Sequence, residues 1–496
     1  MTSRLSTRVL PPASWNFVPA AIENARLRRF AVAAGLGCAS SFVPLGLSYQ
    51  LQLYGDGAMF SYAVAAQDVW AFHWHNISGR IFPFLFSLWP AETVVGLTGR
   101  VQDGLAVYGV LHFVMPLLGL FATFAADRSP GRVFFGFACA STACLCPLVF
   151  GFPTEVWMAH AVFWPVLALC FYPRPGLAGF ALALAGMLAL VFSHDGALIF
   201  AGLVVALLSL RGLRDAAFLR AGAVFALAVA AGFVVRAAFP PDDYFAPVLV
   251  RAALHVFDFS ICTSRLFILL SAVLLGYALS FLLLRGSGSR RTHLAAGALV
   301  ALALAVYWAG IDQGLHADKR YYMRTLLLVA TPAFGALAGL HVLRREGRNL
   351  AAIPGLPRVL TILSGGEAAR FALGALALVL LVHGVETAKF VAAWQHYKAA
   401  LQSLAMGQAS DPELGDPRFV SALRVPRALD RLSWNSTTPY LSALLAHGLA
   451  PARLVVDPRG GYFWLSCKTA TGSEQAARAV PVETRALIRA HACLHR

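Results

Sequence analysis

The sequence predicts an all-α polytopic membrane protein that carries a small additional domain at its C-terminal end. Of its 496 residues 58% are hydrophobic and only 13% are charged, whereas soluble domains carry about 25% charged residues. The mean hydropathy is +0.67. Apolar runs such as 30–53, 294–309 and 371–385 approach the length of roughly 20 residues that a helix needs to cross the bilayer core.

These runs are expected to be helices because a chain inside lipid must satisfy its own backbone N–H and C=O groups. They lack the strict alternation of apolar and polar residues that marks a transmembrane barrel. The formal charge of +16 would suggest nucleic-acid binding in a soluble protein. Here the arginines lie mostly in short loops between apolar runs, a positive-inside pattern that indicates topology and no nucleic-acid ligand.

The N-terminal leader, residues 1–29, is polar and contains Arg26, Arg28 and Arg29. Basic residues beside a first span favour the cytoplasm, so the leader is predicted to be cytoplasmic. The run 30–53 is long enough to span, and no cleavable signal peptide is evident before it. We therefore expect it to be both the first transmembrane helix and the targeting signal.

The first outer loop, 54–104, contains one apolar piece, 81–89, that is interrupted by Pro83 and followed by Pro90. Tryptophan favours the headgroup zone, and three tryptophans lie in or near this piece: Trp70, Trp74 and Trp89. If the piece crossed the membrane, every later arginine cluster would lie outside. The positive-inside rule therefore favours helices that lie at the interface in this loop.

The remaining apolar runs give about eleven spans between residues 30 and 388, with the N-terminus inside and the C-terminus outside. On this topology the basic connections all fall on the cytoplasmic side, and they include Arg128, Arg132, Arg174, Arg211, Arg214, Arg220, Arg285, Arg290, Arg291, Arg344, Arg345 and Arg348. The composition, rich in alanine and arginine and poor in lysine, favours a bacterial inner membrane.

Residues 389–496 are predicted to form a periplasmic domain of α/β or mixed structure. This part is charged and contains turn signals such as the run at 457–461. Its aromatic residues are interpreted as the core of the small domain in preference to sugar-stacking groups. Cys467 and Cys493 are candidates for a disulfide, since that compartment is oxidising.

Ionisable residues gather on the predicted outer face and are candidate binding residues, because charges near the bilayer edge are costly. They are Asp56, Asp68, His75 and Arg80 in the first loop, then Glu155, then His194 and Asp195 in a tight turn, and finally Lys319, Arg320, Tyr321 and Arg324. For any one of them taken singly, exposure of the loop to water is the favoured explanation.

The cluster of Lys319, Arg320 and Arg324 breaks the positive-inside trend. Arginine offers a bidentate fork for phosphate oxygens, and lysine offers a compact charge. A lipid-linked phosphate is therefore the predicted partner of this loop. Anchoring to lipid headgroups is the alternative explanation.

The first helix leads straight into the run Tyr-Gly-Asp-Gly-Ala-Met-Phe-Ser-Tyr at 54–62. Together with the long first outer loop, the multi-span body and the C-terminal domain, this layout resembles the GT-C class of membrane glycosyltransferases. The resemblance covers the topology of nearly the whole chain but only this short stretch at residue level. Many members have a second acid beside the first, whereas Gly57 follows Asp56 here.

The resemblance implies hexosyl or pentosyl transfer from a polyprenyl-phosphate sugar to a glycan, lipid or protein acceptor, with Asp56 as the general base. The second acidic role is left to Asp68, Glu155 or Asp195, or is vacant. Lys319, Arg320 and Arg324 would hold the leaving phosphate. No cofactor is required, and the two-residue spacing of His73 and His75, like the pair His194 and Asp195, is weak evidence for a divalent metal.

Other classes remain open. A transporter or flippase of lipid-linked saccharide would also have many spans, but no internal repeat is evident and the acids cluster at one face. An O-antigen polymerase or ligase would carry its large loop late in the chain. A membrane acyltransferase would need an embedded histidine, for which His160 and His194 are the candidates, and a purely structural membrane protein is a further alternative.

Overall fold

The structure is a computed structural model of the whole chain. It describes residues 25–69, 78–240, 247, 249–250, 254, 260–284, 290–315, 323–348, 350, 365–407, 414, 416–432, 437–457 and 480–493.

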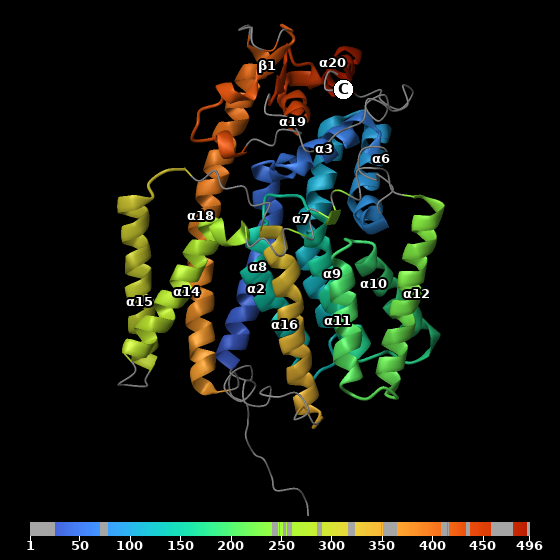
Figure 1. Ribbon diagram of the computed structural model, residues 1–496, viewed down its shortest axis with the longest axis vertical. Helices are drawn as coiled ribbons and strands as arrows, with labels where there is room; N and C mark the ends of the chain where they lie inside the picture. Colours follow the sequence, from blue (N-terminus) through green and yellow to red (C-terminus); the bar gives the residue numbers. More distant parts are fainter. Residues whose placement is uncertain are drawn as a thin grey trace, which may run out of the picture.

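The described chain is a bundle of apolar helices (Figure 1). Eight are long and apolar enough to cross a membrane, which confirms the all-α polytopic class. They are α2 (Ala25–Ser48), the segment Ile81–Thr98 made of α5 (Ile81–Pro83), η3 (Phe84–Leu88) and α6 (Trp89–Thr98), α7 (Val101–Ala126), α12 (Ala216–Ala238), α14 (Arg265–Leu283), α15 (Arg290–Val306) with η7 (Tyr307–Ile311), α16 (Met323–Arg345) and α18 (Gly366–Met406).

Four further apolar helices are shorter. They are α8 (Val133–Leu145) with η4 (Cys146–Leu148), α9 (Glu155–Phe171), α10 (Gly176–Val191) and α11 (Ala197–Ser209). Eleven spans result if these four cross the membrane and Ile81–Thr98 does not. The span count therefore stays a prediction.

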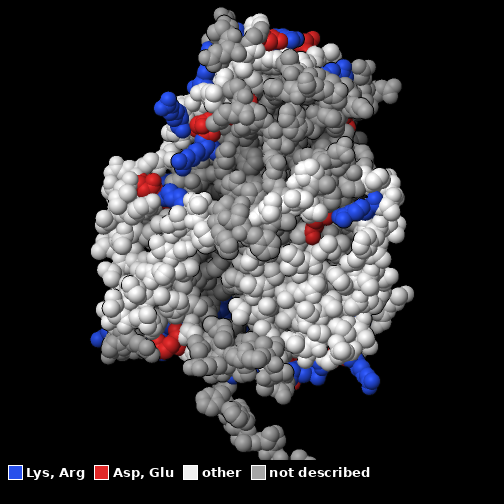
Figure 2. Space-filling view, in the orientation of Figure 1, with Lys and Arg blue, Asp and Glu red and all other residues white. Residues whose placement is uncertain are grey.

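The arginine-rich connections lie together at one end of the bundle, which we call the arginine end. Arg28 in α2 donates to the carbonyl of Gly131 over 3.3 Å, and Arg345 at the end of α16 donates to that of Pro130 over 2.9 Å. Figure 2 shows most acidic and basic side chains of the visible face near the two ends, with a broad, largely uncharged belt between them. A belt of this kind is what the hydrocarbon core of a bilayer requires.

The opposite end, called the Asp56 end, carries the first loop: η1 (Leu51–Leu53), α3 (Asp56–Ala66) and η2 (Ser78–Arg80). Helix α6 lies beside α3 here (Figure 1), and a Cβ on Gly104, near the start of α7, would be 2.2 Å from Cγ2 of Val95 in α6. Helix α7 thus begins at the end where α2 finishes. By length and composition Ile81–Thr98 is one of the eight candidate spans, so its interfacial placement stays a prediction.

Small residues let the helices approach closely. A Cβ on Gly35 of α2 would lie 2.5 Å from the Cα of Cys139 in α8, and one on Gly119 of α7 would lie 2.5 Å from the carbonyl oxygen of Ala161 in α9. In lipid, such backbone approach supplies the packing that holds helices together. These two contacts hold α2 closely against α8, and α7 closely against α9.

Helix α18 has 41 residues, about 60 Å at 1.5 Å per residue, and continues unbroken through the predicted domain boundary at 388. The part after it contains β1 (Phe419–Ser421) paired in parallel with β2 (Leu454–Val456), Phe419 opposite Leu454. Its helices are η10 (Ala422–Arg424), η11 (Asp430–Leu432), α19 (Thr438–Leu445), η12 (His447–Leu449) and α20 (Val482–Cys493). Tyr440 of α19 packs on Tyr62 of α3, with ring centroids 5.1 Å apart.

The predicted disulfide lies outside the described residues, since Cys467 and the side chain of Cys493 are not among them.

Candidate active site

Asp56 is held at the N-terminus of α3 by a tight turn that follows α2. Gly55 has φ +59°, in the left-handed region, and a Cβ there would lie 2.3 Å from the ring of Phe152. Gly57 packs as closely, because its Cβ would lie 2.1 Å from the carbonyl oxygen of Gln52. A larger residue on either side of Asp56 would therefore clash with its surroundings. The two glycines allow the turn to pack closely, with the carboxyl group inside the protein.

The carboxyl group of Asp56 is buried, with the residue 6% exposed. Its Oδ1 accepts no hydrogen bond from any residue that the structure describes. Burial raises the pKa of Asp56 from 3.8 to about 7, against the opposing effects of the Arg324 and Arg80 guanidinium groups, while the Glu155 carboxylate adds to the rise. At neutral pH this carboxyl group is divided between its acid and its base forms.

Arg80 and Glu155 form an ion pair beside Asp56, with Nε and Oε1 3.4 Å apart and both side chains nearly buried. Arg80 ends η2, and Glu155 begins α9. The preceding Gly79 lies against the turn between α10 and α11, since its Cβ would be 2.8 Å from the backbone nitrogen of Asp195. The first loop thus packs against the α10–α11 turn.

His194 in that turn is neutral at physiological pH. Burial, then the charge of Arg324, lowers its pKa to about 4. Its Nδ1 accepts the backbone N–H of Gly196 over 2.9 Å, so the proton of the neutral ring resides on Nε2. The imidazole is a hydrogen-bond donor and has no net charge.

Arg324, in the first turn of α16, is the last member of the polar group that also contains Asp56, Arg80, Glu155 and His194. Its charge acts on both Asp56 and His194, and the neighbouring α10–α11 turn touches α16 where a Cβ on Gly196 would lie 2.9 Å from Leu328. Asp56 and Arg324, from the two loops that the sequence analysis placed on one face, therefore lie at the same end. Five segments of the chain contribute to the group: α3, η2, α9, the α10–α11 turn and α16.

A small cavity of about 10 Å³ lies behind Glu155, room for about one water molecule. Its lining is Phe60, Pro83, Ser87, Leu88, Tyr108, His112, Pro153, Thr154, Glu155 and Met158. Thr154 Oγ1 has no hydrogen-bond partner among the described residues. A water molecule there would satisfy this hydroxyl.

The other predicted site residues have different places. Asp68 lies past the C-terminal end of α3, whereas Asp56 begins that helix, and its charge acts on Tyr62 and Glu92. Asp195 stays next to the group, because its charge acts on His194, but it pairs with Arg236 of α12 over 3.0 Å. His73, His75, Lys319, Arg320 and Tyr321 lie outside the described residues.

The sequence analysis missed a second polar group, which lies between α14, η7 and α18. Arg265 pairs with Asp312 over 2.9 Å and also with Glu386, which the indole of Trp308 reaches over 2.9 Å. Lys389 pairs with the same Asp312 over 3.0 Å. The only signal in the sequence was Glu386 with Lys389, one turn apart in an otherwise apolar run, which is costly in lipid.

Within the described part of the chain, no group of three or more His, Cys, Asp or Glu residues is arranged to hold a metal ion.

No family model, curated protein or solved structure matches this chain. The function is therefore argued from the site alone.

Proposed function

We propose that the protein is a membrane glycosyltransferase that moves a sugar from a polyprenyl-phosphate donor to a hydroxyl acceptor, with Asp56 as the general base. The observation that carries the proposal is the buried Asp56 carboxyl group, whose pKa of about 7 suits a base that must accept a proton near neutral pH. The charges of Arg324 and Arg80 both act on this carboxyl group.

In the proposed reaction the acceptor oxygen bonds to the anomeric carbon of the sugar. The bond from that carbon to the phosphate oxygen breaks, and its electron pair leaves with the phosphate. The acceptor proton passes to Asp56, for which the Oδ1 atom without a described partner is the natural acceptor. This orphaned oxygen otherwise costs stability, because buried acceptors normally have partners.

Arg324 and Arg80 would stabilise the charge that develops on the leaving phosphate. Arg80 is already held by Glu155 at 3.4 Å, which orients its guanidinium group. Neutral His194, a donor through Nε2, would contribute a hydrogen bond to the sugar or phosphate. Lys319 and Arg320 are predicted to add positive charge from the same loop as Arg324.

The Asp56 end is proposed to face the periplasm and the arginine end the cytoplasm of a bacterial inner membrane. This orientation follows from the positive-inside rule. In this orientation the proposed sugar transfer takes place on the periplasmic side of the membrane.

The test is sugar transfer by purified Asp56→Asn, which keeps the shape of the side chain and removes the base. We expect activity to fall at least 100-fold, within the range of about 10² to 10⁴ for loss of general base catalysis. Asp103→Asn is the matched control, because Asp103 is a partly exposed carboxylate in an ion pair with Arg100 at the same end. Full activity of Asp56→Asn would remove Asp56 from the mechanism.

A flippase for lipid-linked saccharide is the second candidate. The ion pair of Arg265 and Glu386, both in candidate spans, favours it, since ionisable groups inside a membrane often mark transport pathways. Asp312, which also pairs with Arg265, follows directly after a third candidate span. Proteoliposomes distinguish the two functions. Flux of a lipid-linked sugar without any transfer product, unaffected by Asp56→Asn, would favour the flippase.

A further inference from the structure

A cavity of about 480 Å³ opens at the arginine end, far from Asp56. Four connections supply its walls: the α7–α8 loop, the end of α9, the α11–α12 loop and the segment after α16. The lining residues are Arg128, Phe171, Tyr172, Pro173, Arg211, Asp215, Glu346 and Arg348. Its volume is within the range of about 300–1,000 Å³ that ligand pockets have.

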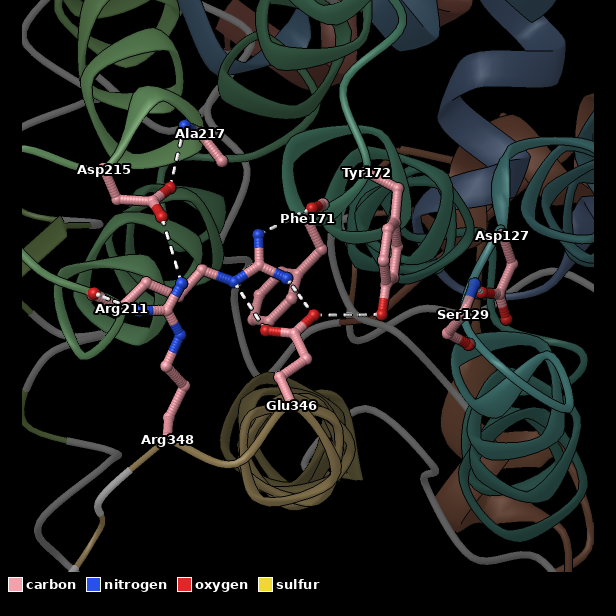
Figure 3. A network of polar contacts seen from close by, with 9 residues as sticks. All are labelled: Asp127, Ser129, Phe171, Tyr172, Arg211, Asp215, Ala217, Glu346 and Arg348. Atoms are coloured by element: carbon pink, nitrogen blue, oxygen red, sulfur yellow. Dashed lines mark hydrogen bonds and ion pairs between the residues drawn. The ribbon is translucent and has the colours of Figure 1, made fainter. Parts of the chain in front are cut away.

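The cavity is built around a bidentate ion pair (Figure 3). Arg211 donates through Nε to Oε2 of Glu346 over 2.9 Å and through Nη2 to Oε1 over 2.5 Å, and the hydroxyl of Tyr172 donates to Oε1 over 3.1 Å. The third nitrogen of Arg211 donates to the carbonyl of Phe171 over 2.7 Å. The carboxylate of Glu346 thus accepts three hydrogen bonds from within the protein.

The second carboxylate of the cavity is occupied as well. Asp215 caps α12 by accepting the backbone N–H of Ala217 over 2.9 Å, and its other oxygen faces Arg348 at 3.4 Å. Arg348 also donates to the carbonyl of Arg211 over 3.1 Å. Both acids of the cavity therefore serve the protein's own structure.

The rim of the cavity has more positive than negative side chains. The lining carries three arginines against two carboxylates. Arg128 is exposed and has no ion pair or hydrogen bond to any residue that the structure describes. The side chain of Arg348 is 43% exposed although it is anchored. Two guanidinium groups thus present donors at the mouth, above an aromatic wall of Phe171 and Tyr172.

We propose that this cavity is a binding site for a phosphate ester, held by Arg128 and Arg348. Guanidinium groups match phosphate oxygens bidentately, and basic pockets between transmembrane helices favour phosphate headgroups. The ester is either the headgroup of an anionic phospholipid or a soluble phosphate compound. Arg211 and Glu346 build the wall and do not contact the ligand.

General positive charge at this end would also attract anionic lipid, but without saturation and without dependence on particular arginines. A built cavity predicts one saturable site whose affinity falls when Arg128 and Arg348 are replaced. This difference makes the proposal testable separately from sugar transfer.

The experiment measures binding to the full-length protein in a neutral detergent, with short-chain phosphatidylglycerol, short-chain phosphatidylcholine, glycerol phosphate and inorganic phosphate as probes. We expect phosphatidylglycerol to bind saturably and at least tenfold more tightly than phosphatidylcholine. Arg128→Gln with Arg348→Gln should weaken that binding at least tenfold. Arg100→Gln, an exposed arginine at the Asp56 end, is the matched control and should bind as the unmodified protein does.

The soluble probes identify the source of the phosphate. Glycerol phosphate or inorganic phosphate binding as tightly as phosphatidylglycerol would indicate a soluble ligand, and much weaker binding would indicate a lipid headgroup. Equal affinity for the two lipids, together with no specific binding of the soluble probes, would overturn the proposal, as would unchanged binding in the double variant. If that variant fails to fold, Arg128→Gln alone decides, because Arg128 supports no described contact.

Discussion

Replacing Asp56 by asparagine should make the folded protein more stable, and the gain should depend on pH. Each pKa unit is equivalent to about 1.4 kcal/mol. The rise in the pKa of Asp56 from 3.8 to about 7 therefore makes the folded protein with ionised Asp56 less stable by ~4 kcal/mol. Asparagine has nearly the same shape and carries no charge, so it removes this cost.

The sign follows from proton binding. Between the two pKa values the folded state holds the proton and the unfolded state has lost it, so stability of the unmodified protein falls as pH rises from about 4 to about 7. Above that range the loss is complete. The advantage of Asp56→Asn should be near zero at about pH 4 and reach ~4 kcal/mol at about pH 8.5.

The assay is denaturant unfolding in detergent, followed by the fluorescence of the ten tryptophans, across that pH range. Asp103→Asn serves as the control, because a solvent-exposed ion pair is worth less than about 1 kcal/mol. A variant less stable than the unmodified protein at about pH 8.5, or a difference that does not change with pH, would refute the reasoning that burial dominates at Asp56.

Three further predictions follow from the same geometry. The rate of sugar transfer should rise with pH through about 7, because only ionised Asp56 can act as a base; a rate that falls over this range would contradict that role. Arg324→Gln removes a charge that lowers the pKa of Asp56, so the rising limb of the pH–rate profile should move to higher pH, and an unmoved limb would place Arg324 elsewhere. Gly35→Ala puts a Cβ 2.5 Å from the Cα of Cys139 and should lower unfolding stability by about 1–3 kcal/mol, whereas unchanged stability would mean that α2 and α8 separate without cost.

The fold class follows from sequence because lipid leaves a spanning chain few alternatives to helices. The acid after the first helix is visible for the same reason, since a charge beside an apolar run is conspicuous. The meeting of Asp56 with Arg324 follows from the positive-inside rule, which assigns both loops to one face. Local patterns thus predict which end of the molecule a residue occupies.

Partners within that end are not predictable in this way. Arg265 and Glu386 are 121 residues apart in sequence, and neither has a neighbour in the chain that indicates the other. The ion-pair partner of Asp195 is Arg236, and this pairing is set by how α12 packs beside the α10–α11 turn. Such pairings depend on helix packing, and packing depends on the whole set of side chains.

Helix α18 joins the bundle to the part of the chain that packs on α3, and it has no proline or other break along its 41 residues. Because a helix of about 60 Å without a break moves as one piece, a change in the tilt of α18 at one end displaces its other end. A rotation of about 5° would move its far end by about 5 Å. Because Lys398 and Trp394 both donate over 3.0 Å to the carbonyl of Tyr49, the helix also grips the chain just before Asp56. A change in the tilt of α18 would therefore also displace Tyr49, seven residues before Asp56.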